Sequence, residues 1–179
     1  MSRVGNRILS IPQGTTVVVE GTKVTVSGKL GKLERVFSPL IKIEVADNTV
    51  RTYRSNEEKH TKQLHGTTNS HIGNMIKGVS EGYKVELEIK GVGYKATLKG
   101  EELEILAGYS HPFVLKVPQG ITVKVGKPTE VEVSGIDKQD VNHFAAVVRE
   151  VRKPSVYSGK GISYKGKQIR RKEGKTASK

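Results

Sequence analysis

The sequence predicts an α+β protein with two similar tandem domains, each a small antiparallel sheet packed with one helix, followed by a basic C-terminal tail. Three observations lead to this prediction: short alternating strands separated by turns, two segments with helical periodicity, and a series of motifs that occurs twice in the same order. The expected boundaries are 1–81 for the first domain, 82–152 for the second and 153–179 for the tail.

Strands account for most of the chain. Residues 83–90 alternate strictly, with Tyr83, Val85, Leu87 and Ile89 on one side and charged residues on the other, which indicates a sheet with one face in water. Short, Val-rich stretches bounded by turn residues predict further strands at 15–20, 23–27, 41–45, 49–54, 94–99, 113–117, 121–125 and 129–133.

Two segments have helical spacing instead. The first is expected to begin at Ser55, because Ser55 and Glu58 fit a capping box, and its apolar stripe continues to Val79. The second starts after Asp137, a good N-cap residue, and must end before Pro154.

Three motifs repeat in order along the chain. Ile11-Pro-Gln-Gly14 returns as Val117-Pro-Gln-Gly120, the strand ending Val-Ser-Gly28 returns before Gly135, and the helical segment 70–79 aligns with 142–151. Duplication explains this order better than chance similarity between Val-rich strands. The alignment puts His71 and His143 at equivalent helical positions, which predicts a packing or hydrogen-bonding role for each.

Charge is concentrated at one end. The 179 residues include 31 Lys+Arg against 18 Asp+Glu, a net charge of +13, and residues 152–179 alone contain ten basic residues and one acidic residue. The absence of Cys excludes disulfide scaffolds and thiol catalysis, and no apolar run suits a membrane span or a signal peptide. A soluble, cytoplasmic protein with polyanionic partners is expected.

Catalytic patterns fail in their context. Gly91-Val-Gly-Tyr-Lys-Ala96 fits a dinucleotide fingerprint, but a strand is expected after it where the fingerprint needs a helix. Gly108-Tyr-Ser-His-Pro112 lacks the second glycine of a nucleophile elbow, and the five His form no metal motif. We therefore expect no enzyme, no cofactor, no metal and no small-molecule substrate.

The tail combines features of an RNA-binding arm. Its cations can neutralise phosphates, its tyrosines can stack on a base or bond a 2′-hydroxyl, and its glycines allow close approach to the RNA backbone. The plainer alternatives are a solvated tail and tyrosines that pack against the domain. Arg3 and Arg7 are weaker candidates. The predicted contacts are Tyr157, Gly159, Lys160, Gly161, Tyr164, Lys165, Lys167, Arg170, Arg171 and Lys172, with Arg3 in addition.

Several of these motifs resemble the bacterial large-subunit ribosomal protein six family, over essentially the whole chain. They are the opening Ser2-Arg3-Val-Gly5, the turn ending at Gly14, the two glycine motifs above and, most specifically, the segment Pro154–Ile162. Ser158 and Ser163 depart from the family pattern, which usually has a cation and an arginine there.

The resemblance implies two tandem domains of similar fold and no catalysis. It implies direct binding to large-subunit ribosomal RNA, mostly by the second domain and tail, near the stalk base and the factor-binding region of the cytoplasmic ribosome. Neighbouring ribosomal proteins and translation factors are the other partners that it suggests.

An alternative of another class is a β-rich adaptor that binds an acidic protein surface and uses its tail for electrostatic steering. Both readings predict sensitivity to salt, but only the first predicts discrimination among RNA structures.

Overall fold

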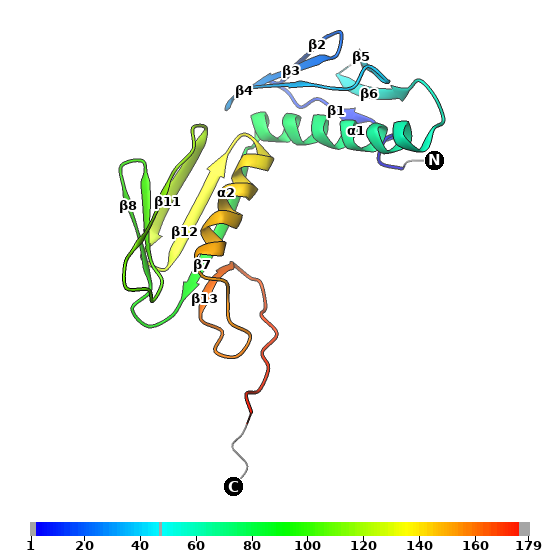
Figure 1. The fold of residues 1–179 in the computed structure, drawn as a ribbon. Helices are drawn as coiled ribbons and strands as arrows, with labels where there is room; N and C mark the ends of the chain where they lie inside the picture. The colour runs from blue at the N-terminus through cyan, green and yellow to red at the C-terminus, as the bar shows by residue number, and fades with distance from the viewer. Residues whose placement is uncertain (1–2, 47, 176–179) are drawn as a thin grey trace. The chain divides into compact units, whose positions relative to one another are not determined.

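The computed structural model describes residues 3–46 and 48–175, which divide into two compact units (Figure 1). The first comprises the residues up to Tyr83 together with Ile136–Lys138, and the second comprises Lys84–Gly135 and the residues from Gln139 onward. Each unit has one long helix and strands that pair antiparallel, so the α+β prediction is confirmed, although each unit has two small sheets where one was expected.

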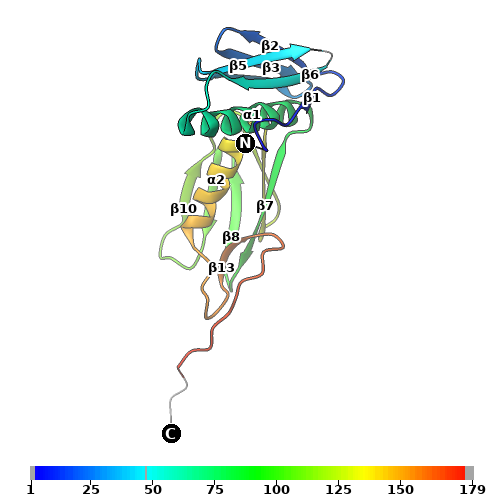
Figure 2. The same cartoon turned by 90° about the vertical axis from the view of Figure 1, so that its right-hand side faces the viewer.

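Six strands form the two sheets of the first unit. One sheet has the order β2-β3-β4, and the other has the order β1-β6-β5. In Figure 2 both sheets lie on the same side of the helix α1. The elements are β1 (Leu9–Ser10), β2 (Thr16–Glu20), β3 (Lys23–Gly28), β4 (Gly31–Val36), β5 (Ile41–Ala46), β6 (Thr49–Arg54) and α1 (Lys59–Ser80).

The first core forms where α1 meets the sheets. Ile72 and Val79 of α1 are fully buried, and β3 contributes Val24 and Val26 on alternate positions of one face. This packing follows from the two periodicities of the sequence, because a 3.6-residue stripe and a two-residue alternation each give one apolar side. The other members of the core cluster are Val17, Phe37, Val50, Met75 and Ile76.

The predicted start of the first helix is wrong. The helix α1 begins at Lys59, and Glu58 at its N-cap makes no side-chain capping bond. Ser55 follows directly after β6, and its backbone N–H donates to the carbonyl oxygen of Leu40 over 3.0 Å. Ser55 is therefore held beside the residue that precedes β5, so the capping box cannot form there.

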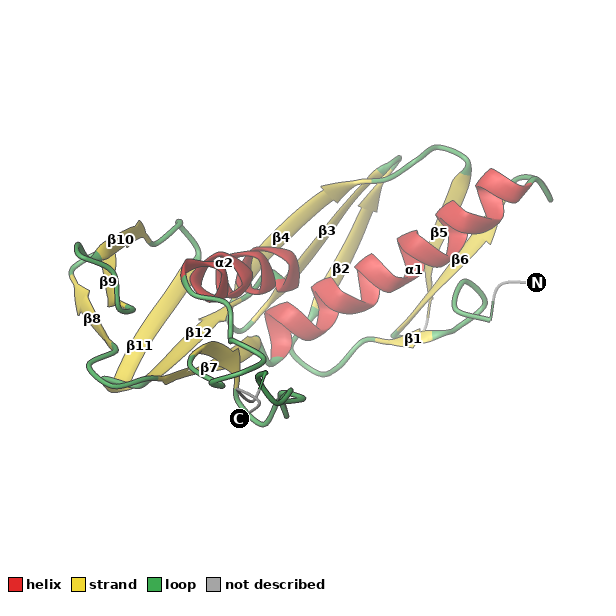
Figure 3. Cartoon of the chain, turned by 60° about the horizontal axis from the view of Figure 1, so that its bottom comes forward, coloured by secondary structure: helices red, strands yellow, loops and turns green. Residues whose placement is uncertain are grey.

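Seven strands form the sheets of the second unit. The larger sheet has the order β11-β12-β7-β13 and the smaller has the order β10-β9-β8. Figures 1 and 3 show α2 alongside β12. The elements are β7 (Tyr83–Lys90), β8 (Lys95–Lys99), β9 (Glu102–Leu106), β10 (Phe113–Lys116), β11 (Ile121–Lys127), β12 (Glu130–Gly135), α2 (Lys138–Val151) and β13 (Gly161–Tyr164).

The helix α2 fits its prediction closely. Asp137 directly precedes it, and Asp140 lies in its first turn, where a carboxylate interacts favourably with the positive end of the helix dipole. One stripe of the helix is buried, comprising Val141, Phe144, Ala145 and Val148. Neither α1 nor α2, the helices of the described part of the chain, has the apolar length to cross a membrane.

Candidate nucleic-acid interface

The first part of the predicted tail is folded. Residues 161–164 form β13, which pairs antiparallel with β7 and places Ile162 opposite Ile89. Ile162 is fully buried, and its N–H donates to the carbonyl oxygen of Arg152 over 2.8 Å. The segment from residue 153 onward, which was expected to be a separate arm, thus includes a strand of the larger sheet of the second unit.

A compact loop connects α2 with β13. The N–H of Ser155 donates to the carbonyl oxygen of Lys160 over 2.9 Å, and the N–H of Gly159 donates to the carbonyl oxygen of Ser155 over 2.9 Å. The hydroxyl oxygen of Ser155 also accepts from the N–H groups of Tyr157 and Ser158. These bonds hold the loop in one shape, with Tyr157 62% exposed and Lys160 exposed at its surface.

The two glycines of this segment serve the protein's own packing. A Cβ on Gly161, at φ +133°, would lie 2.7 Å from the carbonyl oxygen of Lys153 and from the Cα of Pro154. A Cβ on Gly159 would collide with the guanidinium of Arg171. Both glycines are buried. Both positions therefore have a packing reason for glycine within this chain, and close approach of an RNA backbone stays a prediction.

Two of the predicted phosphate-binding cations contact the protein itself. The Nζ of Lys165 lies 2.6 Å from Oε2 of Glu86, and its backbone N–H donates to the Glu86 carbonyl oxygen over 2.9 Å. Hydrogen bonds from Lys165 and Lys84 hold the pKa of Glu86 below its usual value. Arg171 donates from Nη2 to the carbonyl oxygen of Ser158 over 2.9 Å. Exposed pairs of this kind are weak, so an incoming phosphate can displace them.

Tyr164 is half-buried, unlike Tyr157. It pairs with Leu87 across the sheet, and the guanidinium of Arg149 lies 5.7 Å from the centre of its ring. Tyr164 thus packs against its own domain, whereas Tyr157 presents an open ring, and stacking of a base on either tyrosine stays a prediction. The sequence reading missed Arg149, although a cation in the last turn of a helix is a recognisable signal because it interacts favourably with the C-terminal carbonyls.

The remaining predicted cations face water. Within the described residues no ion pair involves Lys160, Lys167, Arg170 or Lys172, and all four are exposed. The N–H of Lys172 donates to the carbonyl oxygen of Val156 over 2.9 Å, which ties the tail to the loop after α2. Figure 1 shows the chain beyond β13 running away from the strands of its unit. The described part of the second unit thus exposes four unpaired cations and one tyrosine on and after the loop that follows α2.

Arg3 and Arg7 belong to the first unit. Both are exposed, in a turn near the N-terminus. Asn69 of α1, which is buried, fixes this turn because its Nδ2 donates to the carbonyl oxygens of Gly5 and Arg7, each over 2.8 Å. The same Gly5 oxygen accepts from the hydroxyl of Thr52 over 3.1 Å.

The histidines have unequal surroundings. Nη1 of Arg35 lies 2.5 Å from Nδ1 of His71, and burial together with the Arg35 charge lowers the pKa of His71. His143 is exposed on α2, so of the two roles predicted for it packing is excluded and hydrogen bonding stays a prediction. His65 was missed because it lies on a stripe of polar residues, yet it is 2% exposed and donates from Nε2 to the Thr52 carbonyl oxygen over 2.8 Å.

A packing requirement explains both glycine motifs. The ring of Tyr94 lies between the turn of residues 91–93 and the loop that begins at Gly108. A Cβ on Gly91 would approach this ring to 2.6 Å, and one on Gly108 would approach it to 2.7 Å. The strand β8 follows Tyr94, as expected. The glycines therefore accommodate an aromatic ring, and the pattern has no helix that could bind a pyrophosphate.

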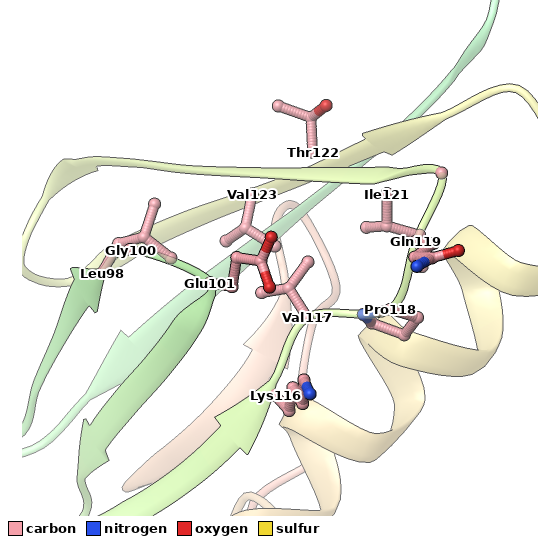
Figure 4. A pocket seen from close by; sticks show the side chains of 11 residues that line it. Leu98, Gly100, Glu101, Lys116, Val117, Pro118, Gln119, Ile121, Thr122 and Val123 are labelled. Atoms are coloured by element: carbon pink, nitrogen blue, oxygen red, sulfur yellow. The ribbon is translucent and has the colours of Figure 1, made fainter.

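A groove of about 790 Å³ lies elsewhere in the second unit. Figure 4 shows Val117, Ile121 and Val123 along it with the carboxylate of Glu101 beside them, and Lys116 also contributes to its lining. None of the predicted site residues lines this groove. Across 3–46 and 48–175, no three His, Asp or Glu come together as metal ligands.

Comparisons with known proteins agree with the duplication. The profile of the family "Ribosomal protein L6" matches residues 11–82 and 90–165, one segment for each half of the chain. The chain is 66% identical over 180 residues to large ribosomal subunit protein uL6 of Mycoplasmopsis synoviae and 64% identical over 179 residues to that of Metamycoplasma arthritidis, with each protein covered in full. It is 49% identical over 176 residues to the protein of the same name from Halalkalibacterium halodurans, covering 98% of this chain and 99% of that protein. The matches extend over the fold and over the cationic segment alike, and the chain therefore belongs to the ribosomal protein L6 family.

Proposed function

We propose that this protein is a structural constituent of the large ribosomal subunit in the cytoplasm and binds its 23S ribosomal RNA directly. The family membership and the names of the relatives support the ribosomal assignment. The observation that carries the binding mode is the exposed, unpaired cations on and after the ordered loop 155–160.

The binding mode combines a fixed part and an extended part. The bonded loop presents Lys160 and Tyr157 in a set geometry, so little conformational entropy is lost when they meet RNA. Lys167, Arg170 and Lys172 follow β13 and neutralise phosphates, which releases counterions. Lys165 and Arg171 exchange their present partners for phosphate oxygens, while Gly159, Gly161 and Tyr164 keep the loop and strand in place.

The surroundings of the binding site follow from the family resemblance. The second unit and tail contact RNA near the stalk base and the factor-binding region, where neighbouring ribosomal proteins and translation factors are further partners. Arg3 adds a contact from the first unit. The protein acts by fixing RNA structure and has no catalytic role.

The test compares charge-neutralising variants of the full chain. Removing everything after Arg152 would also delete β13, so the tail is better tested by changing Lys167, Arg170 and Lys172 to Gln together. The control changes exposed lysines outside the tail, Lys29, Lys59 and Lys95, to Gln and alters the net charge equally. Binding to large-subunit RNA fragments is measured across a salt series.

The tail variant is expected to lose preference for one fragment and to bind with a shallower salt dependence. Each lost phosphate contact reduces the slope of log affinity against log salt by about 0.7–0.9, so three contacts reduce it by roughly 2–3. The control variant should keep both the preference and the slope. Equal effects in the two variants, with no fragment preferred by the wild-type chain, would favour the acidic-protein adaptor.

A further inference from the structure

The loops joined by Tyr94 present an aromatic surface that the proposed RNA contacts leave unused. Tyr109 and Phe113 meet edge to face with ring centres 5.1 Å apart, and His111 lies 5.6 Å from Phe113. Tyr109 is 40% exposed, and His111 is exposed beside it. We call these three side chains, with Arg152, the aromatic patch.

Arg152 gives the aromatic patch a fixed positive charge. Its guanidinium lies 4.9 Å from the centre of the Tyr109 ring, and the Tyr109 hydroxyl donates to the carbonyl oxygen of Val151 over 3.1 Å. The carbonyl oxygen of Arg152 accepts the N–H of Ile162 in β13. Arg152, directly after α2, therefore contacts both the aromatic patch and β13.

An apolar residue extends the same surface. Val92 is 88% exposed at the tip of the turn that Tyr94 joins to the Gly108 loop. The exposed Val and the two exposed aromatic rings thus surround a half-buried fourth ring, Tyr94, which lies against two glycines.

We propose that the aromatic patch is a second RNA subsite, which takes one unpaired nucleotide with its base stacked on His111 or Tyr109 and its phosphate beside Arg152. This inference rests on the proposed function, because it adds a contact to the same RNA-binding face.

Physical chemistry favours a nucleotide as the occupant. Aromatic side chains provide stacking platforms for unpaired bases, and a planar guanidinium provides a fork of donors that matches a phosphate. β13 begins beside Arg152, so the patch adjoins the strand from which the cationic tail continues. The positive charge of the neighbouring tail attracts RNA to the patch, whereas it gives no attraction to an apolar segment of another protein, which is the alternative occupant.

The test measures affinity for the RNA fragment that the wild-type full chain prefers. His111→Ala removes an exposed ring, and His60→Ala is the matched control because His60 is exposed on α1. Tyr109→Leu is a second variant, and its thermal melting is recorded because it loses the bond to Val151. Loss of a stacked base is expected to weaken binding about five-fold to 100-fold. The salt slope should stay unchanged, since stacking releases no counterions.

The outcomes separate this inference from the proposed function. Wild-type affinity in both His111→Ala and Tyr109→Leu would overturn the second subsite, even if the tail variant still loses its salt slope. A changed slope in His111→Ala would also overturn it, because the contact would then be ionic. If the wild-type chain prefers no fragment, the proposed function itself fails. Crosslinking to a fragment that carries 4-thiouridine should label the peptide 109–113, and labels confined to residues after 153 would count against the patch.

Discussion

Replacing Gly161 with Ala tests whether this glycine serves the protein or the RNA. The new Cβ would lie 2.7 Å from the Lys153 oxygen and 2.9 Å from the Arg152 oxygen, both of which are backbone atoms that cannot rotate away. Its φ of +133° also lies where non-glycine residues are strained, at a cost of about 1–3 kcal/mol. With crowding of about 1–3 kcal/mol added, we expect β13 to lose about 2–6 kcal/mol of stability.

Gly166 provides the control. It also has a positive φ, +77°, but a Cβ there would meet nothing within 4 Å. Gly166→Ala should therefore cost only the strain, about 1–2 kcal/mol. Hydrogen exchange at the amide of Ile162, which bonds to the Arg152 oxygen, reports the opening of β13. The difference between the two variants should be about 1–3 kcal/mol, or roughly five-fold to 150-fold in exchange rate.

Two results would refute this reasoning. Equal exchange at Ile162 in Gly161→Ala and Gly166→Ala would show that the crowding is relieved at no cost. Normal protection in Gly161→Ala together with a loss of RNA affinity would restore the original interpretation, in which the glycine admits a phosphate.

Three further predictions concern packing and charge. Ile72→Ala removes a fully buried side chain of the first core and should lower the free energy of unfolding by about 2–5 kcal/mol in denaturant titrations. Hydrogen bonds from Lys23 and Lys32 lower the pKa of Glu34 to about 2, so its carboxylate stabilises the fold above pH 4.5 and this contribution is lost as the pH falls towards 2. In Glu34→Gln the melting temperature at low salt should therefore fall less between pH 4.5 and pH 2 than in the wild-type chain. An equal fall in both proteins would contradict the pairing. Gly108→Ala crowds the Tyr94 ring and should speed exchange in residues 107–113 more than Gly93→Ala, whose Cβ meets nothing within 4 Å.

Local patterns were enough to predict most of the fold. The strands at 49–54 and 83–90 have the predicted limits, because their side chains alternate between core and water over their whole length. The pattern also predicted α2 from its capping residue and apolar stripe. The start of α1 was wrong because the capping box is a local preference, and pairing of the backbone at Ser55 with Leu40 overrides it.

The site was harder to predict because its determinants lie far apart in the sequence. The strand β13 has only four residues among cations and turns, and its partner β7 ends more than sixty residues earlier. Tertiary structure also creates the ion pair of Lys165 with Glu86 and the contact of Arg171 with Ser158. No local sequence pattern indicates either contact. The sequence therefore identified which residues carry the charge, whereas the structure shows which of them already have partners.

The position of β13 in the sheet has a consequence for the order in which the protein is made. β7 leaves the site of synthesis long before its neighbour β13, so one side of β7 stays open until the last part of the chain has been translated. Open strand edges readily pair with other chains. A nascent or prematurely ended chain thus exposes the unpaired edge of β7 and lacks the cationic tail. Only the finished chain covers this edge with β13 and gains the residues proposed to bind RNA.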